Sequence, residues 1–349
     1  MKASKWFISV AVLLALVVLT DNGFGQSKRV GTAAASELLI PIGARDLALG
    51  GSSIANSKGL EAMFWNPAGL GRMHNSAEGM FSSMSYIADI GVDYGAVAGS
   101  FESFGVLGLS ITSMDFGDIP LTTEADPENQ SGRFFSPAFV TVNLGYARGL
   151  TDAIAAGVNL KLISEQIERA SAMGFAIDIG VQYSGLVGVK GLELGVVVKN
   201  IGPQMQYSGS GLYHTSVTTE GMRPAQRYLS EAASFELPSV IEIGLSYEGT
   251  VENNLHYGLN SVFSNNSLYY DEYKLGAEIG YIMEEIELFG RFGMGLVPEI
   301  EDGNSHIFGE SFGAGIHWNA PGMDITVDYA FRSAEFFDGN NVFSVKFGF

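Results

Sequence analysis

The sequence predicts an all-β protein: a transmembrane outer-membrane β-barrel of about 14 antiparallel strands with an N-terminal hatch of short helices in the lumen. Three observations predict it. From about residue 80 onward, apolar residues alternate with small or polar ones. The connections between the alternating segments differ systematically in length, and a glycine-rich, helix-capable stretch precedes all of them. The first two observations indicate the wall of a barrel, and the third indicates what fills it.

The first 25 residues have the features of a secretory signal peptide. Lys2 and Lys5 give a positively charged start, residues 6–19 form an apolar core, and small residues end the segment at Gly25. An apolar run of this length is too short to span a bilayer comfortably, so we expect cleavage rather than anchoring. The expected organisation is a signal peptide at 1–25, a hatch at 26–78 and a barrel at 79–349.

The composition excludes several classes of function. The chain has no cysteine, which rules out disulfides, zinc-thiolate sites and thiol nucleophiles. The formal charge is −19, and it becomes −20 when Lys2, Lys5 and Asp21 leave with the signal peptide. Such an acidic chain repels phosphate backbones, so we expect no nucleic-acid partner. Because only 16% of the residues are charged and 45 are glycine, we expect lipid rather than water to cover part of the surface.

Alternation with a period of two defines the strands. In the last segment Phe343, Val345 and Phe347 fall on one face, and Ser344 and Lys346 fall on the other. The same pattern predicts strands near 79–88, 91–101, 104–114, 137–148, 153–166, 173–184, 191–199, 239–249, 253–262, 272–282, 286–295, 309–319, 322–333 and 340–349.

Loop lengths distinguish a membrane barrel from a soluble sandwich. After the first connection, the odd-numbered connections include all the long ones, whereas the even-numbered ones are tight. The long ones are 115–136, 200–238, 263–271 and 296–308, and the tight ones include 102–103, 149–152 and 319–321. Outer-membrane barrels have short periplasmic turns and long extracellular loops, whereas a sandwich has no reason to segregate its loops. We therefore expect a multi-pass barrel in the bacterial outer membrane, in contact with its lipid.

The stretch GLEAMFWNPAGLGRM, residues 59–73, lacks strand alternation. Asn66-Pro67 is expected to end the preceding helix, because proline has no N–H and disfavours helical geometry in the residue before it. Gly69 and Gly71 then permit a turn and a close approach to the wall. A barrel of this size has a lumen too wide for its own side chains to fill, so this stretch is the predicted plug.

Two motifs resemble the N-terminal signature of the PorV/PorQ family, which lies within the wider group of FadL-like outer-membrane transport proteins. They are PIGARDLALGGSSIA, residues 41–55, and FWNPAGL, residues 64–70. In that group an NPA motif lies in a hatch inside a fourteen-stranded barrel. The residues that match the hatch pattern are Arg45, Gly50, Gly51, Asn66, Pro67, Ala68 and Gly69. The barrel strands carry no equally specific motif, and the long loops do not match.

The resemblance implies one of two non-enzymatic functions. A PorV/PorQ-type protein takes part in type IX protein secretion or in surface attachment of cargo, so its partners would be a secretion translocon and exported proteins. The alternative is a FadL-like channel for the uptake of hydrophobic compounds across the outer membrane. That alternative requires an apolar pocket beside the hatch for a hydrophobic ligand, and a kink in a wall strand at Gly105 or Gly108 that opens the barrel to lipid.

Charged residues on the polar faces of the strands are expected to point into the lumen. They are Lys161, Asp178, Lys199, Glu242, Lys274, Glu278, Arg291, Asp324 and Asp328, to which the same alternation adds Glu193 and Lys346. One interpretation is a salt-bridged lumen that holds the hatch, with Arg45 as a partner for one of the carboxylates. The other is a selective polar pathway.

Two loops are candidates for contacts with other molecules. Residues 115–130 carry five acidic side chains without the spacing of an EF-hand, which leaves calcium binding and a solvated acidic loop as alternatives. The loop over 202–238 contains residue types that are enriched at protein interfaces, and its candidate partner contacts are Tyr207, Tyr213, Arg223, Arg227 and Tyr228. Packing of this loop over the barrel mouth is the other interpretation.

The sequence predicts no catalytic residue, metal site or cofactor. Residues 309–313 match G-x-S-x-G, but strand alternation continues through them, whereas a nucleophile elbow needs a strand-to-helix turn. The five histidines show no metal-binding spacing. An outer-membrane lipid hydrolase would require Ser311 and His317 to meet.

Overall fold

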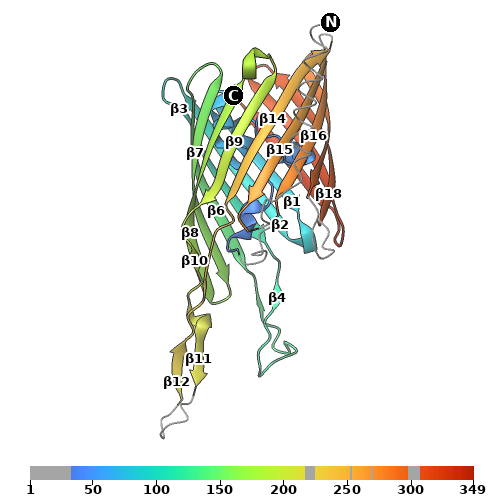
Figure 1. Ribbon diagram of the computed structural model, residues 1–349. Helices are drawn as coiled ribbons and strands as arrows, with labels where there is room; N and C mark the ends of the chain where they lie inside the picture. The colour runs from blue at the N-terminus through green and yellow to red at the C-terminus, as the bar shows by residue number, and fades with distance from the viewer. Residues whose placement is uncertain (1–32, 217–224, 252–253, 269, 298–306) are drawn as a thin grey trace.

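The computed structural model describes residues 33–349 except 217–224, 252–253, 269 and 298–306. In these residues the chain forms a closed barrel of 14 antiparallel strands, as predicted (Figure 1). The predicted signal peptide, residues 1–25, lies outside the described residues. No helix in the described part of the chain is long and apolar enough to cross a membrane.

The barrel strands pair in chain order, and the last strand closes the barrel on the first. They are β1 (Ala77–Ser85), β2 (Gly91–Phe101), β3 (Gly105–Asp115), β6 (Ala138–Gly149), β7 (Ile154–Ile167), β8 (Ala170–Ser184), β9 (Leu192–Ile201), β14 (Val240–Val251), β15 (Leu255–Asn266), β16 (Glu272–Met283), β17 (Ile286–Leu296), β18 (Phe308–Ala320), β19 (Met323–Ala334) and β20 (Asn340–Gly348). Three predicted bounds differ by three residues or more. The first strand ends at Ser85 rather than near 88, because Ile87–Asp89 form the 3-10 turn η4. The strand predicted at 173–184 begins at Ala170. The predicted loop 263–271 is shorter than expected, because β15 continues to Asn266.

Long connections and tight turns lie at opposite ends of the barrel (Figure 1). The connection over 116–137, which we call the short arm, carries β4 (Ile119–Pro120) and β5 (Phe134–Phe135). The connection over 202–239, which we call the long arm, carries β10 (Met205–Gln206), η6 (Ser210–Leu212), β11 (Tyr213–Ser216), β12 (Gln226–Leu229) and β13 (Ser234–Phe235). Long loops of outer-membrane barrels are extracellular, so the arms mark the extracellular end. The opposite, periplasmic end carries η5 (Leu186–Gly188) and the tight turns.

The outer face of the barrel is apolar and the inner face is polar. On β20, Phe343 and Phe347 are 46% and 39% exposed, whereas Ser344 between them is 2% exposed. Large apolar side chains such as Ile179, Leu259 and Phe312 cover the outside of other strands. A closed barrel leaves no strand edge unpaired, and an apolar exterior of this kind suits lipid rather than water. The chain is therefore a protein of the bacterial outer membrane.

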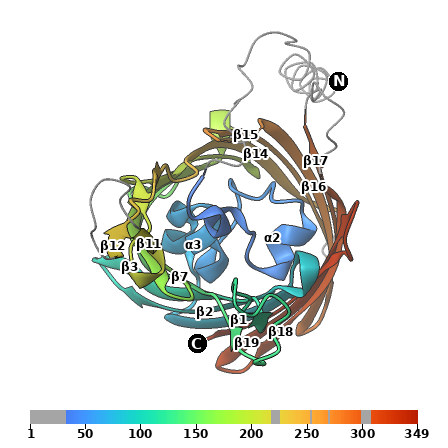
Figure 2. The same ribbon diagram turned by 90° about the horizontal axis from the view of Figure 1, so that it is seen from below.

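The hatch descends through the lumen from the extracellular end to the periplasmic end. It begins where Ala34 N donates to Glu236 O of the long arm, at 3.0 Å, and it ends where Ser76 N donates to Phe349 O, at 2.7 Å. Figure 2 shows its helices inside the ring of strands. The helices are η1 (Ser36–Leu39), α2 (Ala44–Ala48), η2 (Gly59–Glu61), α3 (Ala62–Trp65) and η3 (Pro67–Arg72).

Asn66 joins the two helices that flank it and ties both to the wall. Its backbone N closes α3 on Ala62 O, at 2.9 Å, and its Oδ1 accepts from Ala68 N at the start of η3, at 3.2 Å. Its Nδ2 donates to Ile54 O in the hatch and to Val181 O on β8. Pro67 takes the first position of η3, where a missing N–H is tolerated. The asparagine–proline pair therefore fixes the junction between α3 and η3 in the lower hatch.

Glycines on the inner face of the wall let the hatch come into direct contact with it. A Cβ at Gly157 would lie 2.3 Å from Pro67 O, and one at Gly195 would lie 2.5 Å from Ile54 O. We call the set of wall glycines that face the hatch in this way the glycine girdle. It comprises Gly108, Gly145, Gly157, Gly180, Gly195, Gly244, Gly276, Gly293 and Gly313, each on a different strand. On the remaining side, apolar wall residues such as Met80, Tyr94 and Ala330 share a core with the hatch.

We predict that Gly157→Ala destabilises the protein by about 1–3 kcal/mol, because the new methyl group overlaps the Pro67 carbonyl. Gly290→Ala is the matched control. Gly290 is also a glycine within a barrel strand, but nothing lies within 4 Å of its Cβ position. The measurement is urea-induced loss of heat-modifiable gel mobility for the two variants and the wild type. Equal midpoints for both variants would contradict the close contact between hatch and wall.

Candidate functional site

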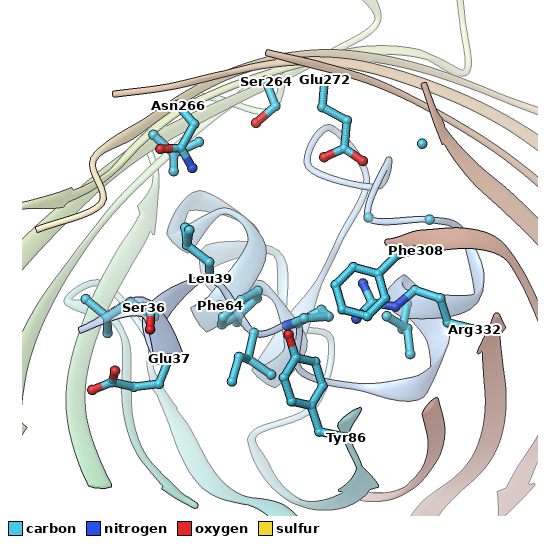
Figure 3. Close-up of a pocket in the computed structure, with 18 of the residues that line it drawn as sticks. Ser36, Glu37, Leu39, Phe64, Tyr86, Ser264, Asn266, Glu272, Phe308 and Arg332 are labelled. Atoms are coloured by element: carbon cyan, nitrogen blue, oxygen red, sulfur yellow. The ribbon is translucent and has the colours of Figure 1, made fainter. Parts of the chain in front are cut away.

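A cavity of about 550 Å³ lies between the hatch and the extracellular mouth (Figure 3). Its volume is within the range of small-molecule binding sites. The hatch contributes its floor, through side chains that include Leu39, Ile40, Phe64 and Trp65. Apolar residues of the wall and of the β1–β2 connection line one side, including Ile90, Met114, Phe116 and Phe139. The cavity is therefore largely apolar next to the hatch.

The opposite side of the cavity carries charges that are mutually paired. Lys199 Nζ lies 2.7 Å from Glu242, which also accepts from Lys274 at 2.8 Å. Lys199 Nζ also lies 5.4 Å from the Phe64 ring centre and 5.7 Å from that of Trp65. A cation held over ring faces and bonded to a carboxylate is well satisfied. This side of the cavity is polar without presenting an isolated charge.

Arg332 forms a distinct corner of the cavity. Its guanidinium carbon lies 3.6 Å from the centre of the Phe308 ring. Its Nε and Nη2 are buried and have no hydrogen-bond acceptor among the described residues. Figure 3 shows Arg332, Phe308 and Tyr86 together on the β18–β19 side of the cavity. Stacking on the ring stabilises this cation in place of hydrogen bonds.

The first described part of the hatch, residues 33–40, crosses the cavity and is called the strap here. Glu165 of the wall holds it, since its Oε1 accepts from Ala35 N at 2.9 Å and its Oε2 accepts from the Tyr207 hydroxyl. Glu37 of the strap lies beside Glu165. Burial and the Glu165 carboxylate raise the pKa of Glu37 to about 8. The strap therefore links the wall, the long arm and the cavity through two neighbouring carboxyl groups.

Eight of the nine predicted lumen residues form ion pairs with one another. The pairs are Lys161–Asp178 at 2.7 Å, Lys199–Glu242 at 2.7 Å, Lys274–Glu242 at 2.8 Å, Arg291–Glu278 at 2.5 Å and Arg291–Asp328 at 2.6 Å. Asp324, near the start of β19, takes part in none of these pairs. Of the two further residues, Glu193 pairs with Arg72 at 3.6 Å and Lys346 pairs with Glu61 at 3.5 Å. Pairing of this kind is what buried charges require.

The hatch joins this network through Arg45. Its Nη2 lies 3.5 Å from Glu278 of the wall, and its Nη1 lies 2.9 Å from Asp46 of the hatch. Asp46 also accepts from Ser57 at 2.8 Å. Burial raises the pKa of Asp46 to about 6, and the neighbouring Arg45 guanidinium opposes that rise. Hatch and wall thus share one chain of charges that crosses the lumen.

The residues of the hatch motif shape the cavity floor. Gly50 and Gly51 have φ of +65° and +72° in the turn after α2. A Cβ at Gly51 would lie 2.8 Å from the Trp65 ring, and a Cβ at Gly69 would lie 2.0 Å from Ser57 O. Both positions therefore require glycine for conformation or for space. The Trp65 ring thus packs against Gly51, and its Nε1 donates to Ile42 O at 2.9 Å.

The predicted kink in the third strand is absent. β3 pairs with β2 along its whole length and with β6 from Val106 to Asp115, without a register shift. Gly105 pairs with Phe101, and Gly108 pairs with Ala98 and Gly145. Gly108 is explained by the hatch, because Met63 occupies the space of its missing side chain. The prediction of a lateral opening at Gly105 or Gly108 is therefore wrong for this structure.

The hydrolase interpretation fails on geometry. Ser311 is a buried residue within β18, and no strand-to-helix turn occurs there. His317 lies six residues further along the same strand, which separates the two by about 20 Å. The His317 ring contacts Thr326 on the neighbouring strand, at 2.9 Å. Ser311 and His317 therefore do not meet.

A carboxylate of the acidic loop accepts hydrogen bonds from the backbone of the same loop. Asp126 accepts from Gln130 N at 2.7 Å and from Ser131 N at 2.9 Å, and the bonds with Ser131, followed by that with Gln130, lower its pKa. Among the described residues, no group of three or more His, Asp or Glu is placed to hold a metal ion. The Asp126 carboxylate therefore has a role in shaping the short arm.

The predicted partner residues of the long arm lie in different environments. Tyr213 and Tyr228 are exposed on the β11–β12 ribbon, as is Arg227. Tyr207 instead contacts the wall through Glu165. Arg223 lies outside the described residues. The ribbon extends well beyond the barrel mouth (Figure 1).

Sequence reasoning missed the cavity and its main residues. Phe64 and Trp65 precede the NPA motif, and their adjacency to it was the available signal for the floor. Arg332 continues the inward alternation of Asp324 and Asp328 on β19, and counting two more steps would have found it. Glu37 lay in a segment without any pattern. The neighbour that raises its pKa, Glu165, comes from β7, and only the fold brings the two carboxyl groups together.

Comparison with known proteins shows the fold alone. No protein-family model matches the sequence, and no curated protein matches it. Similar solved structures include the CymD monoaromatic hydrocarbon channel, with 12% identity, 89% of this chain and 98% of that chain covered, and a TM-score of 0.57. The toluene transporters TbuX of Ralstonia pickettii and TodX of Pseudomonas putida match at 14% and 11% identity, with TM-scores of 0.55 and 0.54. These alignments cover 88% of this chain, and 98% of TbuX and 96% of TodX. The chain thus has the fold of FadL-like outer-membrane channels.

The strap should loosen as the pH rises. The pKa of Glu37 in the folded protein, about 8, lies above its ordinary value of 4.5. The contribution of Glu37 to the stability of the folded strap is therefore fully present below pH 4.5 and is lost as the pH rises through about 8. We expect amide exchange in residues 34–40, corrected for intrinsic rate, to be faster at pH 9 than at pH 6. Glu37→Gln should remove that difference, because the amide stays neutral. A pH dependence that persists in the variant would contradict this assignment.

Proposed function

We propose that this protein is an outer-membrane channel that takes a hydrophobic compound from the extracellular side into the cavity above the hatch and passes it inward. The single observation that carries the proposal is the 550 Å³ cavity between the hatch and the extracellular mouth, with an apolar floor on the hatch. The shared fold with a monoaromatic hydrocarbon channel and two toluene transporters supports it. The paired charges of the lumen are consistent with it, since Glu242 pairs with both Lys199 and Lys274 beside the apolar floor.

The cavity suits weak, reversible binding. Burying about 150 Å² of a small aromatic compound contributes about 4 kcal/mol, at about 25 cal/mol per Å². That free energy corresponds to a dissociation constant of about 1 mM. A compound held this weakly leaves the site readily, as transport requires.

Trp65 provides a direct test of binding. Trp318 is exposed on the outer face, so Trp318→Phe leaves Trp65 as the one tryptophan beyond the predicted signal peptide. We expect toluene to change Trp65 fluorescence saturably in this background. Leu39→Asp places a carboxylate in the cavity and should weaken binding by about tenfold or more. Ile119→Asp, in the short arm outside the cavity, is the matched control. A linear, unsaturable response would overturn the proposed site.

A second candidate function is the PorV/PorQ-type role in protein secretion or surface attachment. The observation that favours it is the pair of arms that project beyond the barrel mouth (Figure 1). The β11–β12 ribbon of the long arm exposes Tyr213, Tyr228 and Leu229, at 50%, 42% and 60%. Exposed aromatic side chains of this kind are typical anchors of protein interfaces.

Co-purification separates the two functions. We expect the secretion role to bring a translocon or exported cargo with the protein from native outer membranes in mild detergent, as identified by mass spectrometry. Replacing Tyr213, Tyr228 and Leu229 by alanine should then reduce recovery of that partner by about tenfold. Phe336→Ala, in the connection between β19 and β20, is the control for an exposed extracellular aromatic residue. Recovery of a lipid-like ligand without any protein partner would count against secretion.

A further inference from the structure

A second, smaller cavity continues from the first along the wall. It measures about 30 Å³ and lies between the hatch and the inner faces of β2, β3 and β6. The two cavities share Glu37, Leu38, Ile40, Phe64, Met114 and Phe139 in their linings. The small cavity, which as it stands has room for water rather than for an aromatic ring, therefore extends the space beside the large cavity downward between hatch and wall.

The small cavity ends at Met63. This hatch residue is fully buried, and its side chain lies in a notch formed by Gly108 and Gly145, which pair across β3 and β6. A Cβ at Gly108 would lie 2.7 Å from Met63 Sδ, and one at Gly145 would lie 3.1 Å from Met63 Cε. Leu70 Cδ2 is 3.3 Å from both positions. Two side-chain tips thus close the notch.

This closure differs from that at three other glycines of the girdle. At Gly157, Gly195 and Gly293 the nearest hatch atoms belong to the backbone, whereas at Gly180, Gly244, Gly276 and Gly313 they belong to shorter or branched side chains. Backbone can move out of the way only if the hatch itself moves, whereas a methionine has three rotatable side-chain bonds and adapts to irregular spaces. The Met63 backbone is held independently, since its carbonyl accepts from Asn159 Nδ2 at 2.6 Å. Rotation of this side chain therefore does not require the hatch backbone to move.

The wall on the periplasmic side of the notch is apolar and small, whereas the small cavity above the notch is lined by both apolar and polar side chains. Val106 and Ala147 pair with each other there, and Ala98 pairs with Gly108. All three are buried. Withdrawal of the Met63 side chain would therefore join the small cavity to a surface that an apolar compound can follow.

We propose that the Met63 side chain is the gate between the cavity and the periplasmic side of the hatch, with the Gly108–Gly145 notch as its seat. The proposal rests on the proposed channel function and adds the route. Because β3 pairs without interruption on both sides, that route runs between hatch and wall rather than through the wall at this strand.

Uptake by intact cells tests the gate. We expect Met63→Ala to raise the initial rate of labelled toluene uptake by about tenfold over wild type, in cells that carry equal amounts of heat-modifiable protein in the outer membrane. Met63→Leu keeps the volume and is the matched control, so its rate should stay near that of wild type. An unchanged rate in Met63→Ala would overturn the gate.

A cysteine variant tests the gate within one folded protein. The chain has no cysteine of its own, so Met63→Cys introduces a single thiol. Benzyl methanethiosulfonate forms a mixed disulfide with that thiol and releases methanesulfinate, which places a ring in the notch. We expect uptake to fall to the level of cells without the protein and to recover after reduction of the disulfide. Uptake that is unaffected by a verified adduct would overturn the gate.

Saturable toluene binding at Trp65 distinguishes the two proposals. Binding in the wild type, with equal uptake by Met63→Ala and wild type, overturns the gate and leaves the channel function standing. Absence of both binding and uptake in the wild type overturns the channel function, and the gate with it. Binding together with faster uptake by Met63→Ala supports both.

Discussion

The direct contact between hatch backbone and barrel wall is the constraint on which the rest of the structure depends. A barrel of 14 strands encloses more space than its own side chains can fill, and the glycine girdle brings the wall within van der Waals distance of the hatch. Close packing of this kind leaves no tolerance for an added methyl group. The many glycines of the sequence are in this respect a packing requirement rather than a sign of flexibility. They also determine where the lumen is closed and where space remains above it.

The charges of the lumen follow from the same arrangement. Filling the barrel with a hatch removes water from the inner wall, so each ionised group there needs a partner. Arg291 bridges Glu278 and Asp328 on the wall, and Arg45 extends the same chain into the hatch. This explains why charged residues alternate with apolar ones along strands whose inner side is largely shielded from water. The network contributes specificity of docking between hatch and wall, while the cavity above it remains largely apolar.

The wall could be predicted from the sequence because lipid and lumen impose opposite demands on successive residues, and that contrast repeats along every strand. The cavity could not, because it is made where side chains from the hatch and several strands converge, and no local pattern records that convergence. Gly108 shows the limit clearly. A glycine in a strand can indicate a bend or a close contact, and the sequence favours neither. The structure assigns it to contact with Met63. Tyr207 is similar, since its partner Glu165 is distant in sequence.

The path of the hatch through the lumen has a consequence for biogenesis. Ala44 N donates to Ser344 Oγ on the last strand, across 300 residues of sequence, and β20 then pairs with β1. A hatch in contact with first and last strands alike completes its contacts only when the final seam has formed. Contacts this distant along the chain make folding slow. Pairing of β20 with β1 is therefore the step that fixes the position of the hatch.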